Sequence, residues 1–141
     1  MMKWYRILSL IGFIFVLNIL WEISTSFLYV YAPDFSFSQH VLMSSLASLG
    51  LIITFLLAVS LGHRNLKWID KPSAMDYLAI IAAGMLTSWK IEMYALDAGS
   101  WFYTPLMPTI FGLGLVPLIQ LFIITIISLI IIRKLNPSLL Q

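Results

Sequence analysis

Four long apolar stretches dominate this sequence, at about 5–31, 40–62, 76–96 and 109–132. A helix needs roughly 20 mostly apolar residues to cross a bilayer core of about 30 Å, and each stretch is long enough. Stretches of this length are too long for strands, and only helices or closed barrels satisfy the backbone inside lipid. We therefore predict an all-α polytopic membrane protein, a single domain over 1–141 with four transmembrane helices.

The composition excludes a soluble enzyme. Hydrophobic residues make up 61% of the chain and charged residues 10%, whereas about 25% of a soluble domain is charged. The chain has no cysteine, so disulfides, thiolate metal sites and cysteine nucleophiles are excluded. The two histidines, His40 and His63, are expected on opposite sides of the membrane. We therefore predict no metal site and no cofactor.

Positive charge is distributed unevenly along the chain. The connections at 32–39 and 97–108 contain no Lys or Arg. This alternation follows the positive-inside rule and predicts that both termini are cytoplasmic. It also accounts for the net charge of +2 without a nucleic-acid partner. The residues that set the orientation are Lys3, Arg6, Arg64, Lys67, Lys71, Arg133 and Lys134.

Three charged residues fall at membrane depth, where each costs about 2.5–3.5 kcal/mol unless it has a partner. Glu22 lies about 17 residues into the first stretch, and Lys90 and Glu92 lie about 14 and 16 residues into the third. All three are therefore expected at similar height in the outer half of the bilayer. We predict that Glu22 pairs with Lys90 between the first and third helices, and that Asn18, one turn before Glu22, extends the polar stripe.

Glu92 is left without a cation in this arrangement. It projects about 200° away from Lys90 on an ideal helix and shares a face with Ser88 and Trp89. A carboxyl group without a counter-charge in a medium of low dielectric tends to bind a proton. We therefore expect Glu92 to be neutral at about pH 7.

The fourth stretch and the loop before it carry a second group of candidates. Gly112, Gly114 and Pro117 are expected to interrupt the helix, and Gln120 is expected to face inward, either filling the kink or contacting a ligand. The loop 97–108 is rich in aromatic residues. It is expected either to rest at the membrane interface or to cover the charged cluster.

Two local signals concern helix starts and contacts. Ser73 followed by Asp76 resembles a capping box and predicts the start of the third helix. Small residues in the second and third helices predict packing surfaces between neighbours: Ser44, Ala47, Ser48, Gly50, Ala79, Ala82, Ala83 and Gly84.

The segment 92–120 resembles a set of small multi-pass prokaryotic membrane proteins of unassigned function. It also resembles, more distantly, a hairpin of the membrane-integral lycopene cyclase and carotenoid hydratase group, in which an acidic residue, a G-x-W-x-[FY] loop and a glycine-rich helix ending in P-[LI]-E-E recur. The resemblance implies a related fold and a protein of a prokaryotic cytoplasmic membrane. It differs at Ile119 and Gln120, where that group has two glutamates that are thought to serve acid–base chemistry on a polyene. The matching positions are Glu92, Asp97, Gly99, Trp101 and Tyr103.

Three functions remain open from the sequence. The first is a noncatalytic subunit or self-assembling module, in which the polar cluster sets helix register. The second is an enzyme that modifies an isoprenoid, carotenoid or other lipid. Its catalytic residues would be Glu92 as general acid, with Glu22 and Lys90 stabilising the developing charge. The third is an oligomeric transporter of a small solute or ion.

The expected partners are the lipid bilayer, a hydrophobic ligand and further copies or subunits. The candidate ligand contacts are Asn18, Trp89, Asp97, Trp101, Tyr103 and Gln120.

Overall fold

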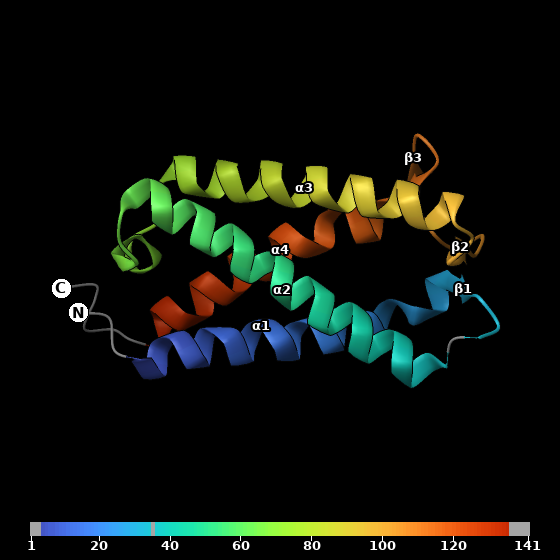
Figure 1. Cartoon of the computed structure of the whole chain (residues 1–141), viewed down its shortest axis with the longest axis horizontal. Coiled ribbons are helices and arrows are strands. Elements are labelled where there is room, and N and C mark those ends of the chain that lie inside the picture. Colours follow the sequence, from blue (N-terminus) through green and yellow to red (C-terminus); the bar gives the residue numbers. More distant parts are fainter. Residues whose placement is uncertain (1–3, 35, 136–141) are drawn as a thin grey trace.

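The computed structural model describes residues 4–34 and 36–135. Lys3, one of the residues used to predict the orientation, lies outside these ranges. Four long helices run side by side along the longest axis (Figure 1): α1 (Trp4–Thr25), α2 (Phe37–His63), α3 (Ala74–Asp97) and α4 (Leu115–Lys134). The mostly helical architecture predicted from the sequence is therefore confirmed.

Three helical segments are long and apolar enough to cross a membrane. They are Tyr5–Leu28, Phe37–His63 and Leu115–Lys134. The remaining long helix, α3, has 24 residues, but its charged side chains include Asp76, Lys90 and Glu92 and reduce its hydropathy. Three apolar helices of this length show that the protein is a multi-pass membrane protein.

The helices pack unequally. α4 packs closely against α3 and α1, and α1 packs against α2, whereas α2 and α3 make few contacts. Figure 1 shows α2 close to α3 where the two are joined and closer to α1 at the other end. The best buried side chains come from all four helices and form one core: Leu10, Ile14, Ile52, Leu56, Ile80, Leu121, Ile124 and Leu129.

Capping boxes start α2 and α3. The Ser73 side chain accepts a hydrogen bond from the Asp76 backbone N–H, and the Asp76 carboxylate accepts one from the Ser73 backbone. Ser36 and Gln39 form the same arrangement at the start of α2. Each box satisfies backbone donors that have no partner inside the helix. The start predicted at Ser73 is confirmed.

Four short strands lie at the end of the molecule opposite the α2–α3 connection, and we call this the strand end. β1 (Tyr29–Tyr31) pairs antiparallel with β2 (Trp101–Tyr103). β3 (Thr109–Ile110) and β4 (Leu113–Gly114) form a tight hairpin. A 3₁₀ turn, η1 (Ser26–Leu28), joins α1 to β1.

These strands shorten two of the expected helices. Residues 29–31 and 109–114 were included in the first and fourth apolar stretches, but 29–31 pair with β2 and 109–114 form the β3–β4 hairpin, with its turn at Phe111 and Gly112. α4 begins at Leu115, so Pro117 lies in its first turn. Backbone N–H groups in a first turn have no intrahelical partner, and a proline is tolerated there. The predicted interruption of a helix at Gly112, Gly114 and Pro117 is therefore wrong.

Close approach between α3 and α4 depends on Gly84. A Cβ atom added there would lie 2.9 Å from Cβ of Phe122 and 3.0 Å from its backbone nitrogen. This confirms a packing role for one of the predicted small residues. Others, including Ser44, Ala47 and Ser48, line a pocket instead.

Candidate functional site

A pocket of about 340 Å³ lies between α2 and α3 near the strand end. α1, α4, β1 and β2 contribute further walls, and the lining is mostly apolar. We call it the strand-end pocket. Polar and aromatic groups are interspersed in its walls: Glu22, Tyr29, His40, Ser44, Ser48, Ser88, Glu92, Trp101 and Gln120.

Glu22 is held on one wall of this pocket. Only 7% of the residue is exposed. Its Oε1 accepts a hydrogen bond from Nε2 of Gln120 at 2.8 Å, and its Oε2 lies 3.6 Å from Nε2 of His40. Nε2 of Gln120 also lies 3.3 Å from Oδ1 of the fully buried Asn18. Two other helices, α2 and α4, therefore contribute polar partners to the carboxyl group of Glu22.

Glu92 is held by the loop that follows its own helix. Its Oε2 accepts hydrogen bonds from the hydroxyl of Tyr103 and from Nε1 of Trp101, the latter at 3.3 Å. Burial is the largest effect that raises the pKa of Tyr103 above its usual range, and the hydrogen bond to Glu92 is the next largest. The phenol therefore stays protonated and donates. The hydrogen bonds found between Glu92 and the described residues use Oε2 alone, which leaves Oε1 available.

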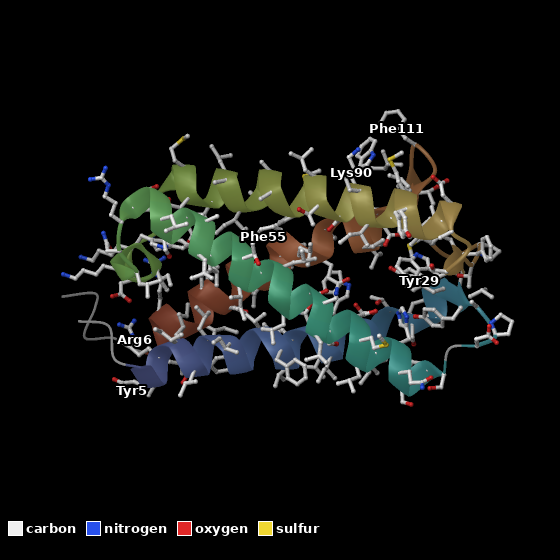
Figure 2. All side chains as sticks on the ribbon, in the orientation of Figure 1. Tyr5, Arg6, Tyr29, Phe55, Lys90 and Phe111 are labelled. Carbon is white, nitrogen blue, oxygen red and sulfur yellow. The ribbon has the colours of Figure 1, made fainter. Side chains whose placement is uncertain are left out.

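Aromatic rings surround the imidazole of His40. Its centroid lies 3.9 Å from the ring of Tyr31 and 6.0 Å from that of Trp101. Tyr29 contacts the edge of Trp101 at 6.4 Å and lies at the strand end in Figure 2. Pairing of β1 with β2 brings these rings together, so the strands close the strand-end pocket above the two carboxyl groups.

The predicted pairing of Glu22 with Lys90 is wrong. Lys90 is exposed, and Figure 2 shows it on the side of α3 that faces away from α1. Glu92 lies two residues later and therefore on nearly the opposite face of the helix. α3 packs with Glu92 inward, so Lys90 takes no part in the site.

Two predicted ligand contacts also lie outside the strand-end pocket. Trp89 is 42% exposed, and its indole N–H lies 2.7 Å from the sulfur of Met93. Asp97 is exposed at the end of α3. The inward face of α3 is set by Ser88 and Glu92, and neither Trp89 nor Asp97 belongs to it. The remaining predicted site residues come together here: Asn18, Glu22, Glu92, Trp101, Tyr103 and Gln120.

Sequence reasoning missed His40 as a member of the site. The signal was present, because His40, Ser44 and Ser48 are spaced four residues apart and share one face of a helix. The hydroxyl of Ser44 lies 3.4 Å from Nε2 of His40. Within residues 4–34 and 36–135, no group of three His, Asp or Glu residues is placed to hold a metal ion.

No family model matches the chain, and no curated protein or solved structure matches it. The resemblance of segment 92–120 to the lycopene cyclase group therefore stays a prediction. In the structure, Glu92, Trp101 and Tyr103 are in contact, and Gly99 has a positive φ of 67° in the turn between them, a conformation that favours glycine. The function must be argued from the strand-end pocket itself.

Proposed function

We propose that this protein is an integral membrane enzyme that carries out acid–base chemistry on an isoprenoid or other lipid. The observation that carries the proposal is the presence of two buried carboxyl groups, Glu22 and Glu92, in one mostly apolar pocket. Burying a carboxyl group is costly unless it is paired or neutral. Two such groups beside empty apolar space are better suited to reacting with a ligand than to holding helices together.

The membrane placement of the proposal follows from the charge pattern. α3 crosses the bilayer as a fourth span, and the termini and the α2–α3 connection lie on the cytoplasmic side. The strand-end pocket then lies in the outer half of the hydrocarbon layer. Because α2 and α3 make few contacts, a lipid enters sideways between them, next to Met43 and Ile91, which are exposed pocket residues.

Glu92 acts as the general acid in this mechanism. It transfers its proton to one carbon of a carbon–carbon double bond, and the other carbon becomes cationic. The aromatic faces of Tyr29 and Trp101 stabilise that cation. The carboxylate of Glu22, with His40 beside it, then removes a proton from a neighbouring carbon. The net reaction is an isomerisation or cyclisation that needs no oxidant or reductant, and the proton returns to Glu92 before the next cycle.

The geometry favours this function over a noncatalytic module. A module needs only a polar cluster that fixes helix register, and the contacts of Glu22 with Gln120 and His40 are enough for that. A module has no use for the pocket of about 340 Å³ between α2 and α3, nor for the second buried carboxyl group, Glu92, that lines it. Sites for membrane-dissolved ligands have this form, with apolar walls and a few placed polar groups.

Deuterium transfer tests the proposal. Purified protein is placed in oleoyl phospholipid vesicles that contain lycopene or heptaprenol, incubated in heavy water, and the extracted lipids are analysed by mass spectrometry. We expect deuterium on carbon with the native protein and a loss of at least about 100-fold with Glu92→Gln. Asp34→Asn, which removes an exposed carboxylate at the same end, should leave the transfer unchanged.

The same preparation distinguishes the other functions. Native mass spectrometry in gentle detergent reports the number of copies and any retained lipid. A folded protein that transfers no deuterium to any of these lipids contradicts the enzymatic proposal. Equal transfer by the native protein and Glu92→Gln contradicts the role of Glu92.

A further inference from the structure

A second pocket lies between α2 and α3, toward their connection. Its volume is about 440 Å³. We call it the η2-end pocket, after η2 (Lys67–Asp70) in that connection. Its walls are mostly apolar or small side chains, with one histidine and one aspartate: Phe55, Ala58, Val59, Gly62, His63, Asp76, Ala79, Ile80 and Ala83.

The two pockets lie in line between α2 and α3, and we call this boundary the α2–α3 seam. Leu51 lines the strand-end pocket, and Phe55, which is one helical turn closer to the α2–α3 connection, lines the η2-end pocket. Figure 2 shows Phe55 near the middle of the molecule. On α3, Ala83 and Ser88 have the corresponding positions. The seam therefore passes along most of the length of both helices.

The length of this seam limits what can fill it. Ser44 and Gly62 are separated by roughly 18 residues of helix, or about 27 Å at about 1.5 Å per residue. One leaflet contributes about 15 Å, half of the hydrocarbon core of about 30 Å. An ordinary acyl chain whose headgroup lies at the connection would end near the middle of the seam. Only a longer chain reaches Glu92.

The connection end of the seam is basic. Arg64, Lys67 and Lys71 are exposed, and in the part of the chain that the structure describes their side chains form no ion pair. The acidic group nearest them in sequence, Asp70, is already paired with Arg6 at 2.6 Å. Asp76, which lines the η2-end pocket, is hydrogen-bonded to Nε2 of His63 at 2.7 Å and to the hydroxyl of Ser73.

We propose that the α2–α3 seam binds a long isoprenoid chain with a phosphate headgroup. The phosphate meets the basic connection, the chain lies along the seam, and its distal double bonds reach Glu92. This inference rests on the proposed function and names the substrate class for the strand-end pocket. The charge at one end selects the phosphate, and the length of the seam selects a chain longer than an ordinary acyl group.

Binding is tested with three probes and native mass spectrometry of the full-length protein. The probes are heptaprenyl phosphate, heptaprenol, which has the same chain without the charge, and geranyl phosphate, which has the charge on a short chain. We expect heptaprenyl phosphate to be retained at least about 10-fold better than either. The double variant Lys67→Gln/Lys71→Gln should remove most of that preference for the phosphate.

A second pair of variants tests the path of the chain. Ala83→Phe fills the seam, whereas Ala82→Phe adds the same side chain at an exposed position of α3. We expect Ala83→Phe to reduce retention of heptaprenyl phosphate and the deuterium that it receives. Ala82→Phe should change neither, and circular dichroism and gel filtration confirm that both variants fold.

The outcomes separate the two proposals. Glu92-dependent transfer to neutral heptaprenol that is unaffected by Ala83→Phe and by the lysine variant overturns the seam and leaves the enzymatic function. Selective, seam-dependent retention of heptaprenyl phosphate without any deuterium transfer supports the seam and overturns the enzymatic function. Equal retention of all three probes overturns the seam.

Discussion

The side-chain amide of Gln120 donates a hydrogen bond to the carboxyl group of Glu22, 2.8 Å away and 98 residues earlier in the chain. Both side chains are buried, each at 7% exposure. The bond ties α4 to α1 at the strand-end pocket. It replaces the ion pair with Lys90 that the sequence led us to expect.

Gln120→Leu should destabilise the protein by about 1–3 kcal/mol, because Glu22 and Asn18 lose a donor while they remain buried. Adding Glu22→Leu should recover part of that loss, since replacing both partners by apolar groups removes the unsatisfied acceptor. Equilibrium unfolding in a mixed detergent system measures both variants. Strictly additive losses would contradict the coupling.

Lys90→Met should not lower the free energy of unfolding by more than about 0.5 kcal/mol, because the side chain is exposed and outside the site. Arg6→Met is the comparison, since Arg6 is a buried cation with a partner, Asp70, at 2.6 Å. Removing one member of a buried pair costs about 3 kcal/mol or more. A large loss for Lys90→Met, measured by the same unfolding assay, would restore the predicted pair with Glu22.

The number and order of the long helices could be predicted because long apolar stretches have few folded forms in lipid. Their ends could not. Tyr29–Tyr31 and 109–114 contain no charged residue that would mark the end of an apolar stretch, so hydropathy does not separate a strand from one more helical turn. Residues 29–31 are extended because they pair with a distant segment, as Tyr29 does with Tyr103. Residues 109–114 leave the helix because they fold back on themselves as a hairpin.

The sequence predicted several members of the candidate site, but it missed His40, included Lys90, Trp89 and Asp97, and paired Glu22 with the wrong residue. Helical geometry shows that Lys90 and Glu92 face different ways, but it does not show which of them faces inward. That choice depends on how α3 rotates against α4, and the close contact of Gly84 with Phe122 sets it. The contacts of Trp101 and Tyr103 with Glu92 depend on the same rotation and on the pairing of β2.

Gly84→Ala should lower the free energy of unfolding by about 1–3 kcal/mol, because the added methyl group would lie 2.9 Å from Cβ of Phe122 and overpacking is destabilising. Gly50→Ala is the matched control on α2, where a Cβ meets nothing within 4 Å. It should stabilise the helix by up to about 1 kcal/mol. The same sign for both changes would contradict the close contact between α3 and α4.

Tyr103 should make the stability depend on pH in the alkaline range. Burial and the hydrogen bond to Glu92 raise its pKa in the folded state, so the folded protein holds the phenolic proton more tightly than the unfolded chain does. Its contribution is complete below about pH 10, the ordinary value for tyrosine, and is lost as the pH rises further. Thermal unfolding should therefore show the native protein losing stability relative to Tyr103→Phe above about pH 10. Tyr94→Phe, at a residue 77% exposed, should track the native protein throughout.

The crossing of the membrane by α3 can be tested directly because the chain contains no cysteine. Asn65→Cys, in the α2–α3 connection, and Ser100→Cys, just after α3, place one thiol on each side of α3, both at exposed positions. If α3 spans the bilayer with the connection inside, a membrane-impermeant maleimide should label Ser100→Cys on intact spheroplasts and Asn65→Cys only after permeabilisation. Ile80→Cys, at a fully buried position, should stay unlabelled in both. Labelling of both end positions from the same side would mean that α3 does not cross the bilayer. The strand-end pocket would then lie outside the hydrocarbon layer, and a lipid substrate could not reach Glu92 from the bilayer.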